Sequence, residues 1–164
     1  MNKLPAKYEP SWVTAIVDTR EQQPLELNPI GVEQGTLATG DYTIKGLENI
    51  ARVERKSLPD LLQCCGQERE RFEREIERLL AFPVRVLIVE ASWADIDMAQ
   101  WRSKLTSQQV AGSLVGWAAR GIQVELVGSH ERAGRFVSRL FYIIARRRYE
   151  ELRSLVHAAT KEIA

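Results

Sequence analysis

The sequence predicts an α/β domain in which a mixed central sheet lies between layers of helices. The first third of the chain alternates short β-rich runs with turn residues, whereas strand and helix patterns alternate from Ser57 onward. The clearest strand is the apolar run 84–89, and an amphipathic helix is expected just before it over 67–81. At 164 residues the chain fits one compact domain. This order of elements predicts a three-layer architecture.

Short strands are expected throughout the first third of the chain. They are predicted near residues 12–17, 32–37, 41–45 and 50–54. The first strand ends at Asp18, and prolines and glycines mark the loop that follows it. The pattern up to this point favours a β-meander, in which each strand pairs with the next.

Helices and strands alternate in the rest of the chain. Helices are expected at 58–65, 67–81, 106–120 and 131–150, strands at 84–89 and 122–127, and a short helix or loop at 91–104 on which Trp93 and Trp101 pack. Pro59 in a first turn marks the start of the first helix. Thr106 opens a capping box, and Gly121 ends the helix that begins there.

Composition excludes several classes of protein. Apolar residues make up 45% of the chain, enough for a core without disulfides. The cysteines, Cys64 and Cys65, are adjacent, and the two histidines lie far from them, so neither a disulfide nor a zinc site is predicted. No apolar run is long enough for a transmembrane helix or a secretory signal. We therefore expect an intracellular protein, located in the cytoplasm or nucleoid, or in a nucleus.

Charge is balanced overall but unevenly distributed. The net charge is +1, so composition alone gives no argument for nucleic acid binding. The segment 132–148, however, contains no acidic residue and six arginines: Arg132, Arg135, Arg139, Arg146, Arg147 and Arg148. Four of them, Arg132, Arg135, Arg139 and Arg146, fall in one stripe beside the apolar face of the helix. This stripe could meet phosphates, but an ordinary solvated face is favoured over a main DNA-binding surface. In the helix 67–81, pairs such as Glu70–Arg74 and Arg71–Glu75 predict a solvated face.

Polar residues at the expected strand ends form the first candidate site. Asp18 ends the first strand, Asp41 follows a turn glycine, and Glu54 ends the fourth strand. Lys56 lies two positions beyond Glu54, so both side chains point to one face while Arg55 points to the other. Carboxylates beside a lysine are what a hydrolytic Mg²⁺ or Mn²⁺ site requires, because the lysine can orient water or offset phosphate charge. Acids at strand ends are also common on plain surfaces, so the pattern by itself leaves both interpretations open.

The literal residues resemble the XPF nuclease family. The matching segments are Val17-Asp18-Thr19-Arg20-Glu21, Gly40-Asp41-Tyr42 and Val53-Glu54-Arg55-Lys56-Ser57, with Asp60 four residues after the lysine. The family signature is G-D, a variable gap and E-R-K-x-x-x-D, usually preceded by V-D-x-R-E at a strand end. Three separated motifs match in order and spacing, and the likeness extends over roughly 13–150.

The resemblance implies a restriction-endonuclease-like fold of the PD-(D/E)XK kind. It also implies a Mg²⁺- or Mn²⁺-dependent endodeoxyribonuclease that cuts flapped, forked or otherwise branched DNA near a single-strand/double-strand junction, in DNA repair or recombination. Carried over to this chain, Asp18, Asp41 and Glu54 would be the metal-binding acids. Asp41, Glu54 and Lys56 would be the catalytic residues. Cleavage would leave a 5′-phosphate and a 3′-hydroxyl.

Other motif positions are expected to support the site. Arg20 would contact DNA or brace the site, and Glu21 would be a second acid at the edge of the metal. Arg55, on the opposite face, would pair with Asp60 or Glu21. Asp60, just inside a helix start, also fits a purely structural role at the positive end of the helix dipole. Tyr42 is expected to pack beside Asp41 and set its angle.

Relatives usually carry a tandem helix-hairpin-helix module after the nuclease domain, and no such module is expected in this sequence. Only about fifteen residues follow position 150, and none is a glycine. We therefore expect a loose lead-in at 1–11, the nuclease domain at 12–150 and a helical extension or tail at 151–164. Branched DNA is the expected partner, together with an accessory DNA-binding protein and a second copy of the chain, paired through the C-terminal helices and last strand.

Two other functions fit the sequence less well. Some members of this family have lost their acids and serve as non-catalytic modules that bind DNA or a partner. The intact acid–lysine set argues against that function here. A nuclease acting on another nucleic acid is the second alternative, because the fold is widely shared.

Overall fold

The computed structural model describes residues 4–161. Its strands are β1 (Thr14–Asp18), β2 (Gly31–Gly35), β3 (Tyr42–Ile44), β4 (Ala51–Lys56), β5 (Val84–Val89) and β6 (Gln123–Leu126). Its α-helices are α1 (Leu58–Cys65), α2 (Arg69–Leu79), α3 (Trp93–Met98), α4 (Ser107–Ala119) and α5 (His130–Lys161), and a 3₁₀ turn, η1, covers Pro10–Trp12. All the predicted strands and helices form, and most of their ends shift by only a few residues. The exception is α5, which extends well beyond its predicted end.

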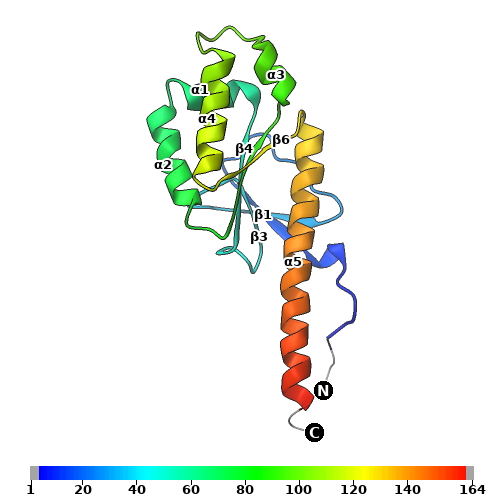
Figure 1. The fold of residues 1–164 in the computed structure, drawn as a ribbon. Coiled ribbons are helices and arrows are strands. Elements are labelled where there is room, and N and C mark those ends of the chain that lie inside the picture. The colour runs from blue at the N-terminus through cyan, green and yellow to red at the C-terminus, as the bar shows by residue number, and fades with distance from the viewer. Residues whose placement is uncertain (1–3, 162–164) are drawn as a thin grey trace.

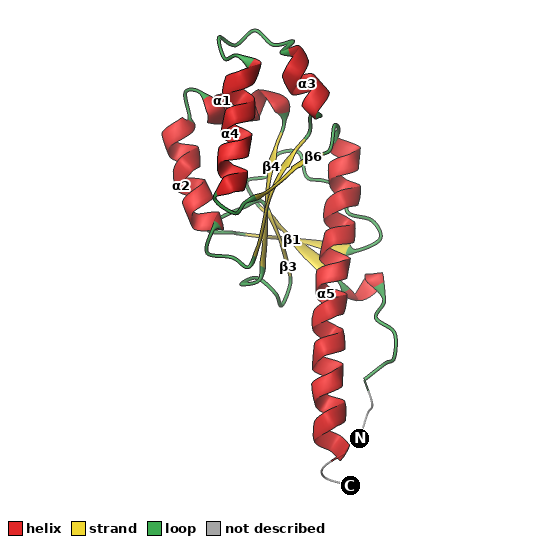
Figure 2. Cartoon of the chain, viewed as in Figure 1, coloured by secondary structure: helices red, strands yellow, loops and turns green. Residues whose placement is uncertain are grey.

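The six strands form one mixed sheet with the order β2-β1-β3-β4-β5-β6. Helices α1 to α4 lie on one side of this sheet and α5 lies on the other (Figures 1 and 2). The predicted three-layer α/β architecture is therefore confirmed. Strands β4, β5 and β6 are parallel to one another, so their carboxyl ends meet at one edge.

The expectation of a β-meander is wrong. β1 pairs in parallel with β2 and antiparallel with β3, so β2 occupies the outer edge of the sheet. A parallel pair requires a crossover of about a dozen residues, and the loop 19–30 supplies one. Leu25, Leu27 and Ile30 of that loop are buried, so the crossover is packed onto the sheet and is not a simple hairpin loop.

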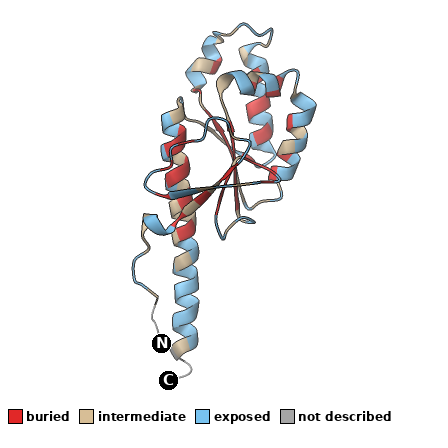
Figure 3. Ribbon diagram, turned by 180° about the vertical axis from the view of Figure 1, so that it is seen from behind, coloured by how far each residue is buried: buried red, intermediate tan, exposed pale blue. Residues whose placement is uncertain are grey.

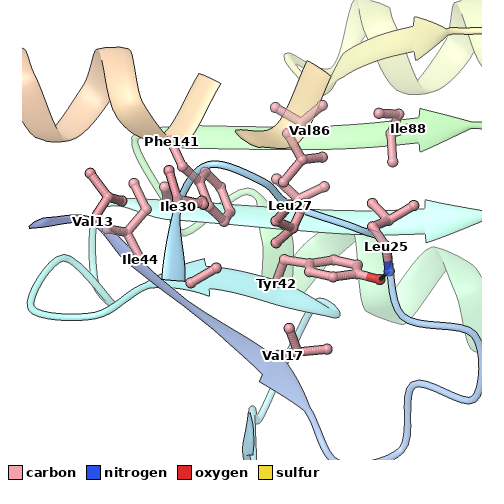
Figure 4. Packing of buried hydrophobic residues seen from close by; sticks show 14 of the residues in the cluster. Val13, Val17, Leu25, Leu27, Ile30, Tyr42, Ile44, Val86, Ile88 and Phe141 are labelled. Atoms are coloured by element: carbon pink, nitrogen blue, oxygen red, sulfur yellow. Dashed lines mark hydrogen bonds between the residues drawn. The ribbon is translucent and has the colours of Figure 1, made fainter. Parts of the chain in front are cut away.

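The core on the α5 side joins four strands (β1, β3, β4 and β5), the crossover loop and α5. Figure 4 shows Tyr42 of β3 and Phe141 of α5 among aliphatic side chains of this cluster, which includes Leu25 and Val86. The Tyr42 hydroxyl accepts a 2.9 Å hydrogen bond from the Leu25 main-chain N–H. Each fully buried aliphatic or aromatic side chain of this kind contributes about 1.5–3 kcal/mol. The loop and α5 are therefore held firmly against the sheet.

The second core lies beneath α1 to α4. It is formed by residues such as Leu87 of β5, Ile76 of α2 and Trp117 of α4. The predicted capping box at Thr106 is present, and Gly121 has φ +100°, as expected of a helix-ending glycine. Trp93 is largely exposed on α3, contrary to the prediction that it packs there.

Helix α5 is longer than predicted. It runs from His130 to Lys161 without a break at 150, and its distal part projects beyond the sheet (Figures 1 and 3). The distal residues Leu152 and Leu155 are exposed. The distal part has no buried apolar stripe from which a helix could be predicted, but its Glu, Leu, Arg and Ala residues favour helix. The expected division at 150 thus falls inside a continuous helix, and residues 1–3 and 162–164 lie outside the described part of the chain.

Within residues 4–161, no helix combines the length and apolar character that crossing a bilayer requires.

Candidate active site

A cleft of about 350 Å³ opens where the ends of β1 and β4 meet α2. It is lined by Asp18, Arg20, Ala38, Gly40, Asp41, Glu54, Lys56, Arg71, Phe72, Glu75 and Arg78. The fold therefore gathers into one cleft the acids at 18, 41 and 54 and the cations at 20 and 56, which were predicted as site residues. The other predicted residues, Glu21, Arg55 and Asp60, do not line it.

Alternation along β4 explains this sorting. Glu54 and Lys56 face the cleft, whereas Arg55 faces the other side of the sheet. The main-chain N–H of Arg55 nevertheless donates a 2.7 Å hydrogen bond to Oδ2 of Asp41. The Asp41 N–H in turn donates to the Val53 carbonyl at 2.8 Å. Backbone hydrogen bonds thus hold Asp41 beside Glu54, as the sequence analysis expected.

Gly40 allows this approach. Its φ is +71°, in the left-handed region, and a Cβ built on it would lie 3.2 Å from the Val53 carbonyl oxygen. The glycine before Asp41 therefore serves the turn and the close pairing with β4.

Asp41, which is half-buried, and Glu54, which is buried, form a pair of like charges. Burial raises the pKa of Asp41 to about 7, and the neighbouring Glu54 charge adds to the increase. Burial also raises the pKa of Glu54, and Lys56 only partly opposes that effect. The carboxylates therefore carry more negative charge than their surroundings neutralise.

Lys56 is the main positive charge facing this pair. Its Nζ donates to Glu54 Oε1 at 2.6 Å and lies 5.3 Å from the centroid of the Phe72 ring. Burial alone would lower the pKa of Lys56, but the Glu54 carboxylate more than reverses this and raises it above the ordinary value. Lys56 therefore stays a charged ammonium held against one carboxylate.

Both carboxylate oxygens of Asp18 accept hydrogen bonds from other groups of the protein. Its Oδ1 accepts from the Nε of Arg20 at 2.7 Å, and its Oδ2 accepts from the Leu37 N–H at 2.7 Å. The Arg20 side chain, chiefly through this hydrogen bond, lowers the pKa of Asp18 to about 2 against the effect of burial. Asp18 is therefore an anion that orders the loop at Leu37 and fixes the Arg20 side chain. This arrangement is consistent with the expectation that Arg20 braces the site. Its predicted role as a metal ligand stays a prediction.

Behind the cleft, Arg55 links two acids across the other face of the sheet. Its guanidinium donates to Glu21 Oε1 at 2.8 Å and Oε2 at 2.9 Å, and to Glu90 Oε1 at 2.8 Å. Nδ1 of His130, the first residue of α5, lies 2.6 Å from the same Glu90 oxygen. Of the two partners that the sequence offered for Arg55, the structure shows Glu21. Glu21 thus faces away from the cleft rather than toward a metal edge.

The Tyr42 side chain lies behind the cleft as well. Its hydroxyl donates to Glu21 Oε2 at 3.2 Å. It therefore packs in the core beneath Asp41, and it braces Glu21 rather than the carboxylate of Asp41.

Asp60 acts at the start of α1. The Ser57 hydroxyl donates to Asp60 Oδ2 at 2.6 Å and accepts from the Asp60 N–H at 3.3 Å. These contacts cap the helix, and Asp60 is exposed outside the cleft. The geometry therefore supports a structural role for Asp60 at the start of α1.

Glu75 is a cleft residue that the sequence analysis missed. Its Oε1 accepts from the Thr39 hydroxyl at 3.0 Å and from the Gly40 N–H at 3.1 Å, while Oε2 pairs with Arg78. The predicted Arg71–Glu75 and Glu70–Arg74 pairs are absent among the described residues, where Arg71 pairs with Glu68. The sequence could have indicated Glu75 through its position directly before Ile76 of the buried stripe. That position places Glu75 at the border of the apolar face of α2, toward the edge of the sheet.

The donor set fits a hard divalent cation. Within residues 4–161 no three His, Cys, Asp or Glu side chains form a ready-made metal cluster. Two carboxylates plus water and phosphate oxygens nevertheless suffice for Mg²⁺ or Mn²⁺. Asp41 Oδ1 and Glu54 Oε2 accept no hydrogen bond from the described residues. Their mutual repulsion would be relieved by a cation bound between them.

Comparison with known proteins identifies the family and the fold of the chain. A family model for the ERCC4 domain matches residues 17–140. No curated protein matches significantly. Among solved structures, XPF from Aeropyrum pernix is similar, with a TM-score of 0.65, 19% identity, and coverage of 87% of this chain and 69% of that one.

The same archaeal protein in complex with DNA also matches, with a TM-score of 0.64 and 19% identity. This match covers 80% of the present chain and 64% of that one, so the chain spans about two thirds of the length of these relatives. The match of the family model spans both halves of the cleft, from Asp18 to Lys56, as well as α2 and most of the sheet. The chain therefore belongs to the ERCC4 domain family and has the fold of an XPF-type nuclease domain.

Proposed function

We propose that the protein is a divalent-metal-dependent endonuclease that hydrolyses phosphodiester bonds in branched DNA. The observation that carries the proposal is the pair of half-buried Asp41 and buried Glu54, which lies beside Lys56 in an open cleft. Two adjacent acids with raised pKa values are costly to folding and are therefore typical of a functional site. Membership of the ERCC4 domain family and the similarity to an XPF structure in complex with DNA support the same conclusion.

Each residue of the cleft has a distinct role in this proposal. Asp41 and Glu54 would hold Mg²⁺ or Mn²⁺ through their free oxygens. When bound, such a cation lowers the pKa of a water molecule and screens the phosphate charge. Lys56 presents an ammonium group beside Glu54, where it can orient the attacking water and offset negative charge growing on the phosphate. In-line attack would leave a 5′-phosphate and a 3′-hydroxyl.

The rim of the cleft is suited to a DNA strand. The side chains of Arg20 and Arg71 are 70% and 72% exposed and line the opening. Exposed guanidinium groups recognise phosphates with paired hydrogen bonds. Asp18 and the Leu37 carbonyl hold Arg20 through its Nε and Nη2, which fixes the direction of that side chain and leaves Nη1 to face a phosphate. We propose that these arginines position the backbone and that the acids and lysine act on it.

The wider setting of the enzyme is part of the proposal. A substrate with a single-strand/double-strand junction would place it in DNA repair or recombination, inside the cell. An accessory DNA-binding partner and a second copy of the chain are the proposed associates, because the family model covers the nuclease region and the resemblance implies dimers.

The test is cleavage of end-labelled flap, fork and linear duplex DNA in Mg²⁺, Mn²⁺ or EDTA. Wild type is compared with Asp41→Asn and Lys56→Ala. The matched controls are Asp97→Asn and Lys45→Ala, which remove the same charges from exposed positions outside the cleft. We expect metal-dependent cutting of flap or fork by wild type and both controls, and loss of at least about a hundredfold in both cleft variants.

Failure of well-folded wild type to cut any of these DNAs in either metal would contradict the proposal. Tight DNA binding without cleavage would instead indicate a non-catalytic binding module. Cutting of a matched RNA substrate in preference to DNA would indicate a different nucleic acid target.

A further inference from the structure

A second pocket lies on the side of the sheet opposite the cleft. Its volume is about 410 Å³, and its walls are α5, the end of the crossover loop at Asn28–Ile30, and Pro10. The charged groups in it are the guanidinium groups of Arg135, Arg139 and Arg146, and none of its lining residues is acidic. We call this pocket the α5 groove. The α5 groove shares no lining residue with the cleft, and its wall α5 lies on the opposite side of the sheet from α2, which lines the cleft (Figure 1).

The wall facing the arginines is firmly attached to the helix. Ser138 of α5 donates a 3.0 Å hydrogen bond to the Asn28 carbonyl. Gly134 lets the loop approach closely, because a Cβ at that position would lie only 2.4 Å from the Glu26 carbonyl oxygen. Leu27 and Ile30 on either side of the loop segment are buried in the core. The groove is therefore a built concavity rather than a gap under a loose loop.

The arginines of the α5 groove are free to bind an anion. Arg139 forms no hydrogen bond or ion pair with any residue in the described range 4–161. The ion pairs of Arg135 and Arg146 are long, at 3.4 Å to Glu131 and 3.5 Å to Glu150, and both glutamates are mostly exposed. Exposed pairs of this kind contribute little free energy. Arg146 also lies over the Tyr142 ring, 5.7 Å from its centroid, and this contact leaves its N–H groups available. A phosphate can therefore displace these glutamates and gain stronger, charge-assisted hydrogen bonds.

The spacing of the arginines suits a row of phosphates. Eleven residues separate Arg135 from Arg146, which corresponds to about 16 Å along the helix. One DNA strand carries a phosphate about every 3.4 Å along the duplex axis, so this length matches about four or five phosphates. A single small anion would need only one guanidinium fork. The extended row instead favours a nucleic acid backbone.

We propose that the α5 groove binds the phosphate backbone of one arm of a branched DNA while the junction lies at the cleft. This inference rests on the proposed function, since it takes the substrate class from there. Two separate binding surfaces on opposite sides of the sheet match a substrate that has more than one arm. A simple linear duplex lying in the cleft has no second arm to place in the groove.

The experiment measures binding of a fluorescently labelled forked DNA by anisotropy, in EDTA and over a range of salt concentrations. The test variant is Arg135→Ala/Arg139→Ala. The matched control is Arg147→Ala/Arg148→Ala, which removes two charges from exposed positions of the same helix outside the groove. Thermal unfolding of each variant checks that the fold is kept, and Arg135→Lys/Arg139→Lys separates charge from shape.

We expect the test variant to reduce the slope of log affinity against log salt by about 1.4 to 1.8, because each of the two lost phosphate contacts removes about 0.7 to 0.9. At about 0.1 M salt this corresponds to about 25- to 60-fold weaker binding. The lysine variant should recover much of the affinity, and the control should keep the wild-type slope. The loss should be larger on the fork than on its duplex arm alone.

Equal losses in the test and control variants would overturn the assignment to the groove, because net charge would then explain the effect. Equal losses on the fork and on the duplex arm would overturn the assignment to a second arm. Cleavage of the same fork in Mg²⁺ is scored in parallel. If wild type and the test variant cut and bind the fork equally well, only the groove proposal fails. If wild type binds the fork through the groove but never cuts it, the proposed enzymatic function fails instead.

Discussion

The main-chain N–H of Arg55 donates to the Asp41 carboxylate on one face of the sheet, while the Arg55 guanidinium lies on the other face between Glu21 and Glu90. One residue thus connects the acid of the cleft with a buried ion network behind it. The side chains of Arg55, Glu21 and Glu90 are all largely buried. Because water cannot solvate the two carboxylates fully, Arg55 is needed to neutralise them.

Replacing Arg55 with Met should destabilise the protein by about 3–5 kcal/mol, because two largely buried carboxylates would lose their partner. Urea denaturation followed by circular dichroism measures the free energy of unfolding. The control is Arg74→Met on the exposed side of α2, which should change stability by less than about 0.5 kcal/mol. A loss at Arg55 of under about 1 kcal/mol would show that the network is not held as described.

Replacing Glu75 with Ala should lower cleavage about 10- to 100-fold and raise the metal concentration needed for half-maximal cleavage. The reason is that Glu75 anchors the Gly40 N–H next to Asp41, and partners that orient metal ligands have effects of this size. Glu75→Gln keeps an oxygen acceptor and should recover most of the activity. Glu70→Ala, an exposed change on the same helix, is the control. An unchanged metal requirement in Glu75→Ala would contradict a positioning role.

Stability should fall in acid partly through Asp18. Its pKa is lowered from 3.8 to about 2 in the folded protein, so its stabilising contribution is present above about pH 4 and is lost as pH falls through about 2. The contribution is about 1–2 kcal/mol, reduced because its partner Arg20 is largely exposed. Asp18→Asn should therefore be less stable than wild type at pH 5 and nearly equal to it at pH 2. Chemical denaturation at both values measures the difference, with Asp97→Asn as a control that should show no such convergence.

Replacing Gly134 with Ala should destabilise the protein by about 1–3 kcal/mol or more, because the new methyl group would meet the Glu26 carbonyl at 2.4 Å. Gly112→Ala and Gly116→Ala in α4 are the matched controls, since an added Cβ meets nothing within 4 Å at either position. Both should stabilise by about 0.5–1 kcal/mol through helix propensity. Thermal unfolding reports all three, and a neutral Gly134→Ala would mean that the loop yields easily.

Local patterns were sufficient to predict most of the fold. The capping box at Thr106 and the glycine at 121 located α4, and apolar periodicity located β5 and α2. The pairing of β2 could not be predicted, because a parallel crossover depends on how the loop 19–30 packs onto α5. The unbroken continuation of α5 past residue 150 could not be predicted for a different reason: there the helix has no sheet to cover and so no apolar periodicity.

The candidate site was predicted where neighbours in the chain determine it. The alternation Glu54, Arg55, Lys56 correctly sorted three side chains onto two faces. Contacts between distant segments were not accessible in this way. Glu75 meets Gly40 across 35 residues, and Glu90 meets His130 across 40, and neither contact leaves a local periodic signal.

The alternation along β4 also makes the strand intolerant of slippage. Shifting its pairing by a single residue would turn Arg55 into the cleft and drive Glu54 and Lys56 toward the packed interior occupied by Val53. The same slip would separate the Asp41 carboxylate from its backbone donor. A mispaired chain would therefore lose its packed core together with the arrangement of the cleft, so the cleft is expected to exist only in correctly folded molecules.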